Sequence, residues 1–136
     1  MKKVGILLCV CLFAACQQVD KTKTITVIDP NNTSEMALLM REMFSELEGI
    51  KEKIQKGEDI SSEQLDFELI HNQTPTDEGF LKEGIKSRSN AYAYSVNFFN
   101  EEPNSKNFSS IVNNCMSCHT MMCPGPLERI DNLILE

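Results

Sequence analysis

Cys115-Met116-Ser117-Cys118-His119 places two thiols three residues apart, and an imidazole follows the second thiol at once. On an α-helix, positions i, i+3 and i+4 share one face, so these three side chains are expected to point the same way. The spacing is typical of c-type haem attachment. With six cysteines and two histidines in 136 residues, roughly 0.004 such motifs are expected by chance. The sequence therefore predicts one covalent haem c, with His119 as the proximal iron ligand.

Other kinds of site use the same side chains. A zinc ion also takes Cys and His ligands, and Cys123 would complete a set of four with Cys115, Cys118 and His119. Adjacent residues such as Cys118 and His119 rarely reach one tetrahedral ion together, and the usual second ligand pair is missing. A redox-active dithiol would need a βαβ context, which the sequence lacks. The alternatives of zinc, a disulfide or a structural thiol pair stay open, and haem is favoured.

The N-terminal part of the chain has the pattern of an exported protein. Lys2 and Lys3 precede an uncharged apolar run over residues 4–15. This run is too short to span a bilayer and is typical of a secretory signal peptide. Residues 12–16 read Leu-Phe-Ala-Ala-Cys, which resembles the lipobox of bacterial lipoproteins. That resemblance implies cleavage before Cys16 and a lipid on its thiol.

The lipobox resemblance implies a protein of the bacterial envelope that faces the periplasm and is held to the membrane by its lipid anchor only. Gln17 rather than Asp follows Cys16, which implies the outer membrane. The alternative is an ordinary signal peptide that leaves Cys16 as a free thiol. We assign residues 1–15 to the signal peptide, 16–33 to the lipidated cysteine and a polar tether, and 34–136 to one haem-binding domain.

Composition agrees with an exported, acidic cofactor protein. Cys9 and Cys11 leave with the signal peptide and Cys16 takes lipid, so too few cysteines remain for a disulfide framework. The whole chain has 13 basic and 20 acidic residues and a formal net charge of −7. Loss of Lys2 and Lys3 makes the mature net charge about −9. This charge argues against nucleic acid as a partner and favours a redox partner protein with a basic docking surface.

Apolar periodicity and end signals predict the first two helices. The first spans about 34–56, with Asn32 as its cap and Gly57 as its terminator. A capping-box pattern at 61–64 predicts a second, short helix over about 62–71.

The same signals predict two longer helices and a tail. The third helix takes its apolar stripe from residues 81–99 and is interrupted by Gly84. The fourth begins near Asn107, carries the haem motif and stops at the Pro-Gly-Pro of residues 124–126. The tail over 127–136 contains the apolar residues Leu127, Ile130 and Leu133 and is expected to fold back after the proline break.

Four amphipathic helices with short loops favour an all-α fold, an antiparallel four-helix bundle with the haem on its last helix. Only 17 residues follow His119, which leaves no room for the compact cytochrome c fold. The arrangement resembles the cytochrome c-prime family, over residues 34–122 in architecture and 115–119 in motif. Members of that family follow their histidine with an aromatic and a basic residue, whereas this chain has Thr120 and Met121. The resemblance implies a haem in the bundle core and binding of NO or CO.

The ligand on the other side of the iron must come from another helix. The resemblance implies that the first helix crosses this distal face, which makes Met40 or Met43 a candidate. The alternative is that both methionines fill the core. His71 is a further candidate, and its alternative role is to cap a helix or fix a loop. Arg41 and Arg129 can pair with haem propionates, or remain solvated surface charges.

Two functions follow, and the sixth iron ligand separates them. If Met40, Met43 or His71 binds, the protein is an electron carrier, which we favour. If none binds, a five-coordinate iron makes it a gas-binding sensor or scavenger. We expect no enzyme activity, since peroxidase-like turnover needs a distal acid or base and only His71 is available. Cys123 is expected to be a small packing residue, with a cross-linked homodimer as the alternative.

Overall fold

The computed structural model describes residues 33–136. In this part of the chain the regular structure is helical throughout, with no β-strand, so the all-α prediction is confirmed. The predicted signal peptide, Cys16 and nearly all of the tether lie outside the described residues. None of the described helices is long and apolar enough to cross a membrane. The elements are α1 (Glu35–Lys56), η1 (Ile70–Asn72), η2 (Glu78–Phe80), α2 (Ile85–Glu101), α3 (Ser105–Met122) and α4 (Leu127–Asp131).

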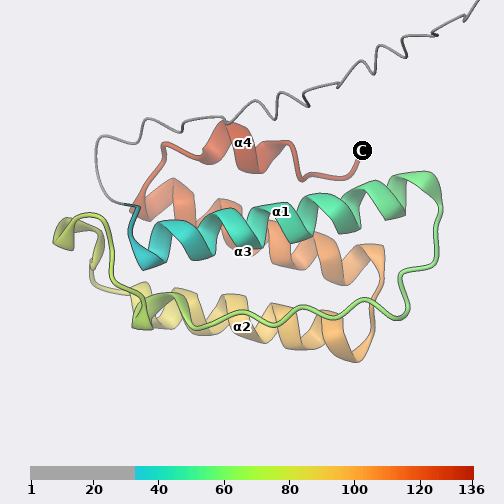
Figure 1. Cartoon of the computed structure of the whole chain (residues 1–136), viewed down its shortest axis with the longest axis horizontal. Coiled ribbons are helices and arrows are strands. Elements are labelled where there is room, and N and C mark those ends of the chain that lie inside the picture. The colour runs from blue at the N-terminus through green and yellow to red at the C-terminus, as the bar shows by residue number, and fades with distance from the viewer. Residues whose placement is uncertain (1–32) are drawn as a thin grey trace, which may run out of the picture.

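The long axes of α1, α2 and α3 are roughly aligned (Figure 1), α2 packs on α3, and α4 packs on α3. Figure 1 shows that α1 and α2 run in the same direction and that α3 runs opposite to both. The segment over residues 57–84 makes this possible, because it returns along α2 from the end of α1 to the start of α2. The predicted up-and-down order is therefore wrong at its first connection, which is a long crossover rather than a helix between two short loops.

The predicted helix over 62–71 is not formed, and residues 63–69 have no regular structure. The side chain of Asn100 on α2 explains why. Its Oδ1 accepts from the Leu65 N–H at 2.9 Å, and its Nδ2 donates to the Leu65 carbonyl at 2.7 Å. The backbone of the segment thus finds its hydrogen bonds on another element, where a helix would have supplied them internally.

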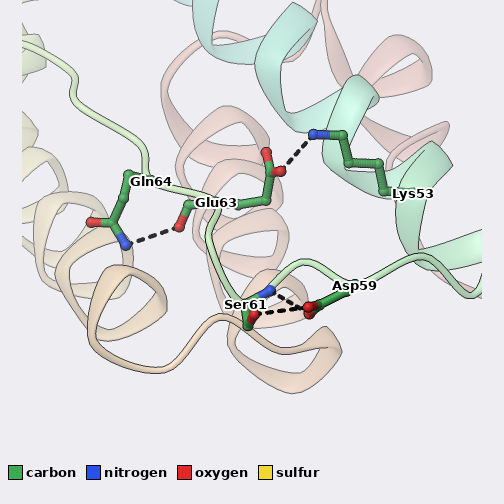
Figure 2. A network of polar contacts seen from close by, with 5 residues as sticks. All are labelled: Lys53, Asp59, Ser61, Glu63 and Gln64. Atoms are coloured by element: carbon green, nitrogen blue, oxygen red, sulfur yellow. Dashed lines mark hydrogen bonds and ion pairs between the residues drawn. The ribbon is translucent and has the colours of Figure 1, made fainter.

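The capping box predicted at 61–64 is replaced by other contacts, which Figure 2 shows. Asp59 accepts from the backbone N–H of Ser61 at 2.9 Å and from its hydroxyl at 3.1 Å. The hydroxyl of Ser61 is thus bonded to Asp59 in this turn and does not cap a helix. Glu63 forms an ion pair with Lys53, which ties the segment to α1.

Helix ends follow ordinary capping chemistry. The N-cap of α1 is Ser34, whose hydroxyl accepts from the Ala37 N–H at 3.2 Å, rather than the predicted Asn32, which lies outside the described residues. Gly57 ends α1 in the left-handed conformation with φ 68°, as predicted. Gly84 has φ 88° and precedes α2, so it bounds this helix and does not interrupt it.

The core lies between the inward faces of the long helices, as the apolar stripes predicted. The crossover segment and the tail close its sides. Lys51 of α1 donates to the Asn132 carbonyl at 2.6 Å and holds the tail in place. The core contains Leu39, Met43, Phe44, Leu47 and Ile50 of α1, Tyr92, Val96 and Phe99 of α2, Phe108, Ile111 and Val112 of α3, and Ile60, Leu65, Ile70 and Leu133 from the remaining segments.

Candidate functional site

A cavity of about 360 Å³ opens among the described helices, with walls from α1, α3, the start of α2 and the tail. Its volume falls within the range of roughly 300–1,000 Å³ that small-molecule and cofactor sites occupy. The cavity brings together seven of the residues predicted from the sequence to bind the cofactor: Cys115, Cys118, His119, Met40, Met43, Arg41 and Arg129.

Helix α3 presents the motif to this cavity on one face. Cys115, Cys118 and His119 all line it, as the i, i+3, i+4 spacing predicts. The two cysteines are half-buried and the histidine is buried. Asn104 starts the helix by accepting from the N–H of Asn107 at 2.9 Å, so α3 begins two residues earlier than expected. Nearly five helical turns thus hold the motif on a rigid element.

The imidazole of His119 is held in one orientation by Cys123. Its Nδ1 lies 3.1 Å from the Cys123 carbonyl oxygen and 3.3 Å from the Cys123 Sγ. A carbonyl oxygen only accepts, so Nδ1 carries the proton and donates it to this oxygen. In the neutral ring Nε2 then has a free lone pair, which is the form that binds a metal.

Burial lowers the pKa of His119, and the hydrogen bond to the Cys123 carbonyl opposes this effect. Burial raises the pKa of the Cys115 thiol to about 12. The pKa values of Cys118 and Cys123 are also raised, mainly by burial. At neutral pH the cavity therefore contains a neutral imidazole and protonated thiols.

The two methionines proposed as distal ligands both reach the cavity from α1. Met43 is buried and Met40 is partly buried against the core. Met36, one turn before Met40, lines the same wall. A helical spacing of three or four residues thus directs three thioether side chains to one side of the cavity.

The two arginines lie on the cavity wall from different elements. The guanidinium carbon of Arg129 lies 4.2 Å from the centre of the Phe44 ring, so this arginine packs on α1 through a cation–π contact. Arg41 donates from Nη1 to the Thr33 hydroxyl at 3.4 Å. Both positive groups are exposed and stand at the edge of an otherwise apolar cavity.

His71 does not line the cavity. It lies in η1, and its Nδ1 is 2.9 Å from the hydroxyl of Ser89 on α2. The backbone N–H of His71 also donates to this hydroxyl, at 3.4 Å. His71 therefore fixes the crossover segment to α2, which is the loop-fixing role that the sequence left open.

Some residues of the site gave no signal in the sequence. Ser89 is buried and lines the cavity, and Ser34 and Thr76 line it at the start of α1. The Ser34 and Thr76 hydroxyls lie 2.9 Å apart although 42 residues separate them. Single serines and threonines of this kind carry no periodic or spacing pattern. Cys123 is partly exposed and lines the cavity, so it is more than the packing residue that we expected.

Within residues 33–136, no group of three or more His, Cys, Asp or Glu side chains is arranged to hold a metal ion. The zinc site considered from the sequence is thus not assembled there. No protein-family model, curated protein or solved structure matches the chain.

Proposed function

We propose that this chain is an electron-transfer protein that binds one covalent haem c in the cavity between α1 and α3. One observation carries the proposal: both thiols and the imidazole of the Cys-x-x-Cys-His motif line a single apolar cavity of a size suited to a cofactor. The geometry of His119 supports it, because the Cys123 carbonyl leaves Nε2 free to bind iron.

The residues of α3 would attach the cofactor without an oxidant. Each thiol of Cys115 and Cys118 would add across one vinyl group, so that sulfur bonds to one carbon and the thiol proton goes to the other. His119 would bind iron from the same helical face. When bound, the haem supplies a one-electron iron couple.

Residues on the other elements would surround the cofactor. Met40 and Met43 bring thioether sulfurs from α1 to a cavity wall that is largely apolar. Arg41 and Arg129 stand where two cations can pair with propionates through charge-assisted hydrogen bonds. We propose a methionine of α1 as the sixth ligand, since both methionines line the cavity whereas His71 does not and is engaged by Ser89.

A gas-binding protein is the second candidate, and the apolar lining favours it. If no methionine binds the iron, one coordination position would stay open to NO or CO. Peroxidase-like chemistry has less support, because it needs a distal acid or base. Among the described residues, no carboxylate lines the cavity, and His71 is absent from its wall.

The first experiment tests covalent attachment. The full chain is produced in a host that matures c-type haem, and its mass and Soret absorbance are measured. Cys115→Ala and Cys118→Ala should each lose one thioether, and the double variant should lose covalent haem. Cys123→Ser is the matched control, since this cysteine lines the same cavity outside the motif, and it should keep the haem. A purified protein without bound tetrapyrrole would contradict the proposal.

A second experiment separates the two candidate functions. The visible spectrum of the reduced protein is recorded with and without CO. A sharp α/β pair that CO does not change supports the electron carrier, and a broad band that CO converts supports gas binding. Met40→Ala or Met43→Ala should open the iron to CO if that residue is the ligand. Met36→Ala is the control from the same wall.

The location and partners of the protein are also proposals. A lipid on Cys16 would hold it to the bacterial envelope facing the periplasm, in the outer membrane. The net charge of −7 favours a redox partner with a basic docking surface. Electron transfer to such a partner should slow as salt is added, because salt screens the attraction between exposed charges.

A further inference from the structure

We propose that Cys123 and Pro124 form a positioning device that orients His119 and strengthens its Nε2 as an iron ligand. The device would thereby favour the oxidised iron and lower the reduction potential of the site. This inference rests on the proposed haem for its redox consequence, whereas the orientation of the imidazole can be tested without haem.

Three atoms of Cys123 contact His119. The Cys123 N–H donates to the His119 carbonyl at 3.2 Å, which closes the last turn of α3. The Cys123 carbonyl oxygen and Sγ lie 3.1 and 3.3 Å from the ring Nδ1. The ring N–H therefore has one strong acceptor and one weak, polarisable acceptor on the same residue.

Pro124 is the reason that this carbonyl is available. In a continuing helix the Cys123 carbonyl would point along the axis and accept from the N–H four residues later. The proline ring disfavours the helical conformation for the residue before it, and Cys123 accordingly has φ −155° and ψ 89°. This conformation turns the carbonyl oxygen back toward the imidazole of residue 119.

A second contact stabilises this helix end. Lys82 donates from Nζ to the Met122 carbonyl at 2.8 Å and satisfies one of the carbonyl groups that α3 leaves unpaired. The end of the helix is thus held from outside as well as by Cys123. The acceptor for the imidazole N–H is accordingly placed before any cofactor binds.

The hydrogen bond has a defined effect on the metal ligand. Donation from Nδ1–H to a carbonyl fixes the tautomer and raises the basicity of the opposite ring nitrogen. A more basic Nε2 donates more electron density and stabilises the oxidised iron relative to the reduced iron. Loss of the acceptor should shift the one-electron equilibrium toward the reduced form.

The main test compares two proline variants of the full-length haem protein. In Pro124→Ala, the ratio of reduced to oxidised protein at a fixed potential should rise about tenfold, which is about 59 mV for a one-electron couple. Pro103→Ala is the control, because this proline lies between α2 and α3 and is not among the residues that line the cavity, and its ratio should be unchanged. A Pro124→Ala protein with covalent haem and an unchanged ratio would overturn the inference.

Variants of Cys123 test the thiol separately and cover the case in which Pro124→Ala fails to fold. Cys123→Ser keeps a second acceptor and should leave the ratio within about twofold of the unmodified protein. Cys123→Ala keeps only the carbonyl and should raise the ratio about threefold. An equal ratio in the serine and alanine variants would show that the thiol takes no part.

A haem-free readout separates this inference from the proposed function. In the full chain with Cys115 and Cys118 changed to Ser, the ¹⁵N spectrum of His119 should show a protonated Nδ1 and an unprotonated Nε2. The Pro124→Ala change in that background should give the mixture of tautomers typical of a free imidazole. If the unmodified protein carries no haem but this contrast is found, only the proposed function fails. If the tautomer is mixed in both proteins, the positioning role fails.

Discussion

At the scale of single residues, Tyr92 is the least satisfied polar side chain in the core. Its hydroxyl is buried and has no hydrogen-bond partner within the described residues. Burial raises its pKa, and the neighbouring Cys115 thiol adds to the effect. A buried hydroxyl without a partner costs about 1–3 kcal/mol of desolvation free energy.

We therefore expect Tyr92→Phe to leave the free energy of unfolding unchanged or to raise it by about 1 kcal/mol. Urea unfolding of the haem-free full chain measures this. Tyr94→Phe is the control, since Tyr94 is 65% exposed. A loss of more than about 1 kcal/mol in Tyr92→Phe would show that the hydroxyl has a partner that the protein alone does not supply.

The residues of the motif differ from His71, another predicted site residue, in how far away along the chain their positions are determined. Cys115, Cys118 and His119 are spaced three and four residues apart, so they lie on one face of the helix. Their common direction could therefore be predicted from the spacing alone. No such local spacing sets the position of His71, because its hydrogen-bond partner Ser89 lies 18 residues away on another helix. Its position could only be found once the crossover segment was placed against α2.

At the scale of elements, the crossover segment is held in place by side chains that form hydrogen bonds with its backbone groups. Asn100→Ala should lower the free energy of unfolding by about 2 kcal/mol, because the Leu65 N–H and carbonyl both lose their partner. Urea unfolding and amide exchange at Leu65 measure the effect. Asn97→Ala, at an exposed position of the same helix, should change stability by less than about 0.5 kcal/mol.

The start of α1 is tied to the crossover segment by Glu35. Its carboxylate accepts from the Thr74 hydroxyl at 2.6 Å and from the Thr74 N–H at 3.1 Å. These hydrogen bonds favour the charged form and lower the pKa of Glu35 below its usual value. The contribution to stability is therefore complete above the unfolded-state pKa and is lost as pH falls through the lower pKa of the folded state.

The stability difference between the unmodified chain and Glu35→Gln should follow that pH dependence. It should be constant near neutral pH and shrink below about pH 4. Urea unfolding at a series of pH values measures it. Glu48→Gln is the control at an exposed position of the same helix and should give a difference that stays near zero. A difference for Glu35→Gln that grows on acidification would contradict this account.

At the scale of the whole molecule, we propose that a lipid on Cys16 attaches the protein to the membrane. Cys16→Ser should move the protein from the membrane fraction to the soluble periplasmic fraction, because the lipid is its only proposed anchor. Fractionation and immunoblotting measure this distribution. Cys11→Ser, within the predicted signal peptide, should leave the protein in the membrane fraction. A Cys16→Ser protein that stays with the membrane would exclude a lipid on this thiol as the anchor.

Features that depend on neighbours along the chain could be predicted without a structure. The apolar stripe and Gly57 predicted α1, and the proline at 124 predicted the end of α3. The motif spacing predicted that two thiols and an imidazole share one face of a helix, and all three line one cavity. All of these predictions rest on contacts within about four residues, where backbone geometry leaves few choices.

Contacts between segments far apart in the chain set the course of residues 57–84, the parallel direction of α1 and α2, and the shared cavity. The capping-box pattern at 61–64 predicted a helix because a local pattern reports only local partners. Asn100 lies 35 residues from Leu65 and supplies the hydrogen bonds that this helix would have made. Buried backbone groups form hydrogen bonds with whichever partners the fold brings near them. Partners so far apart in the chain form no spacing pattern from which this hydrogen bond could be predicted.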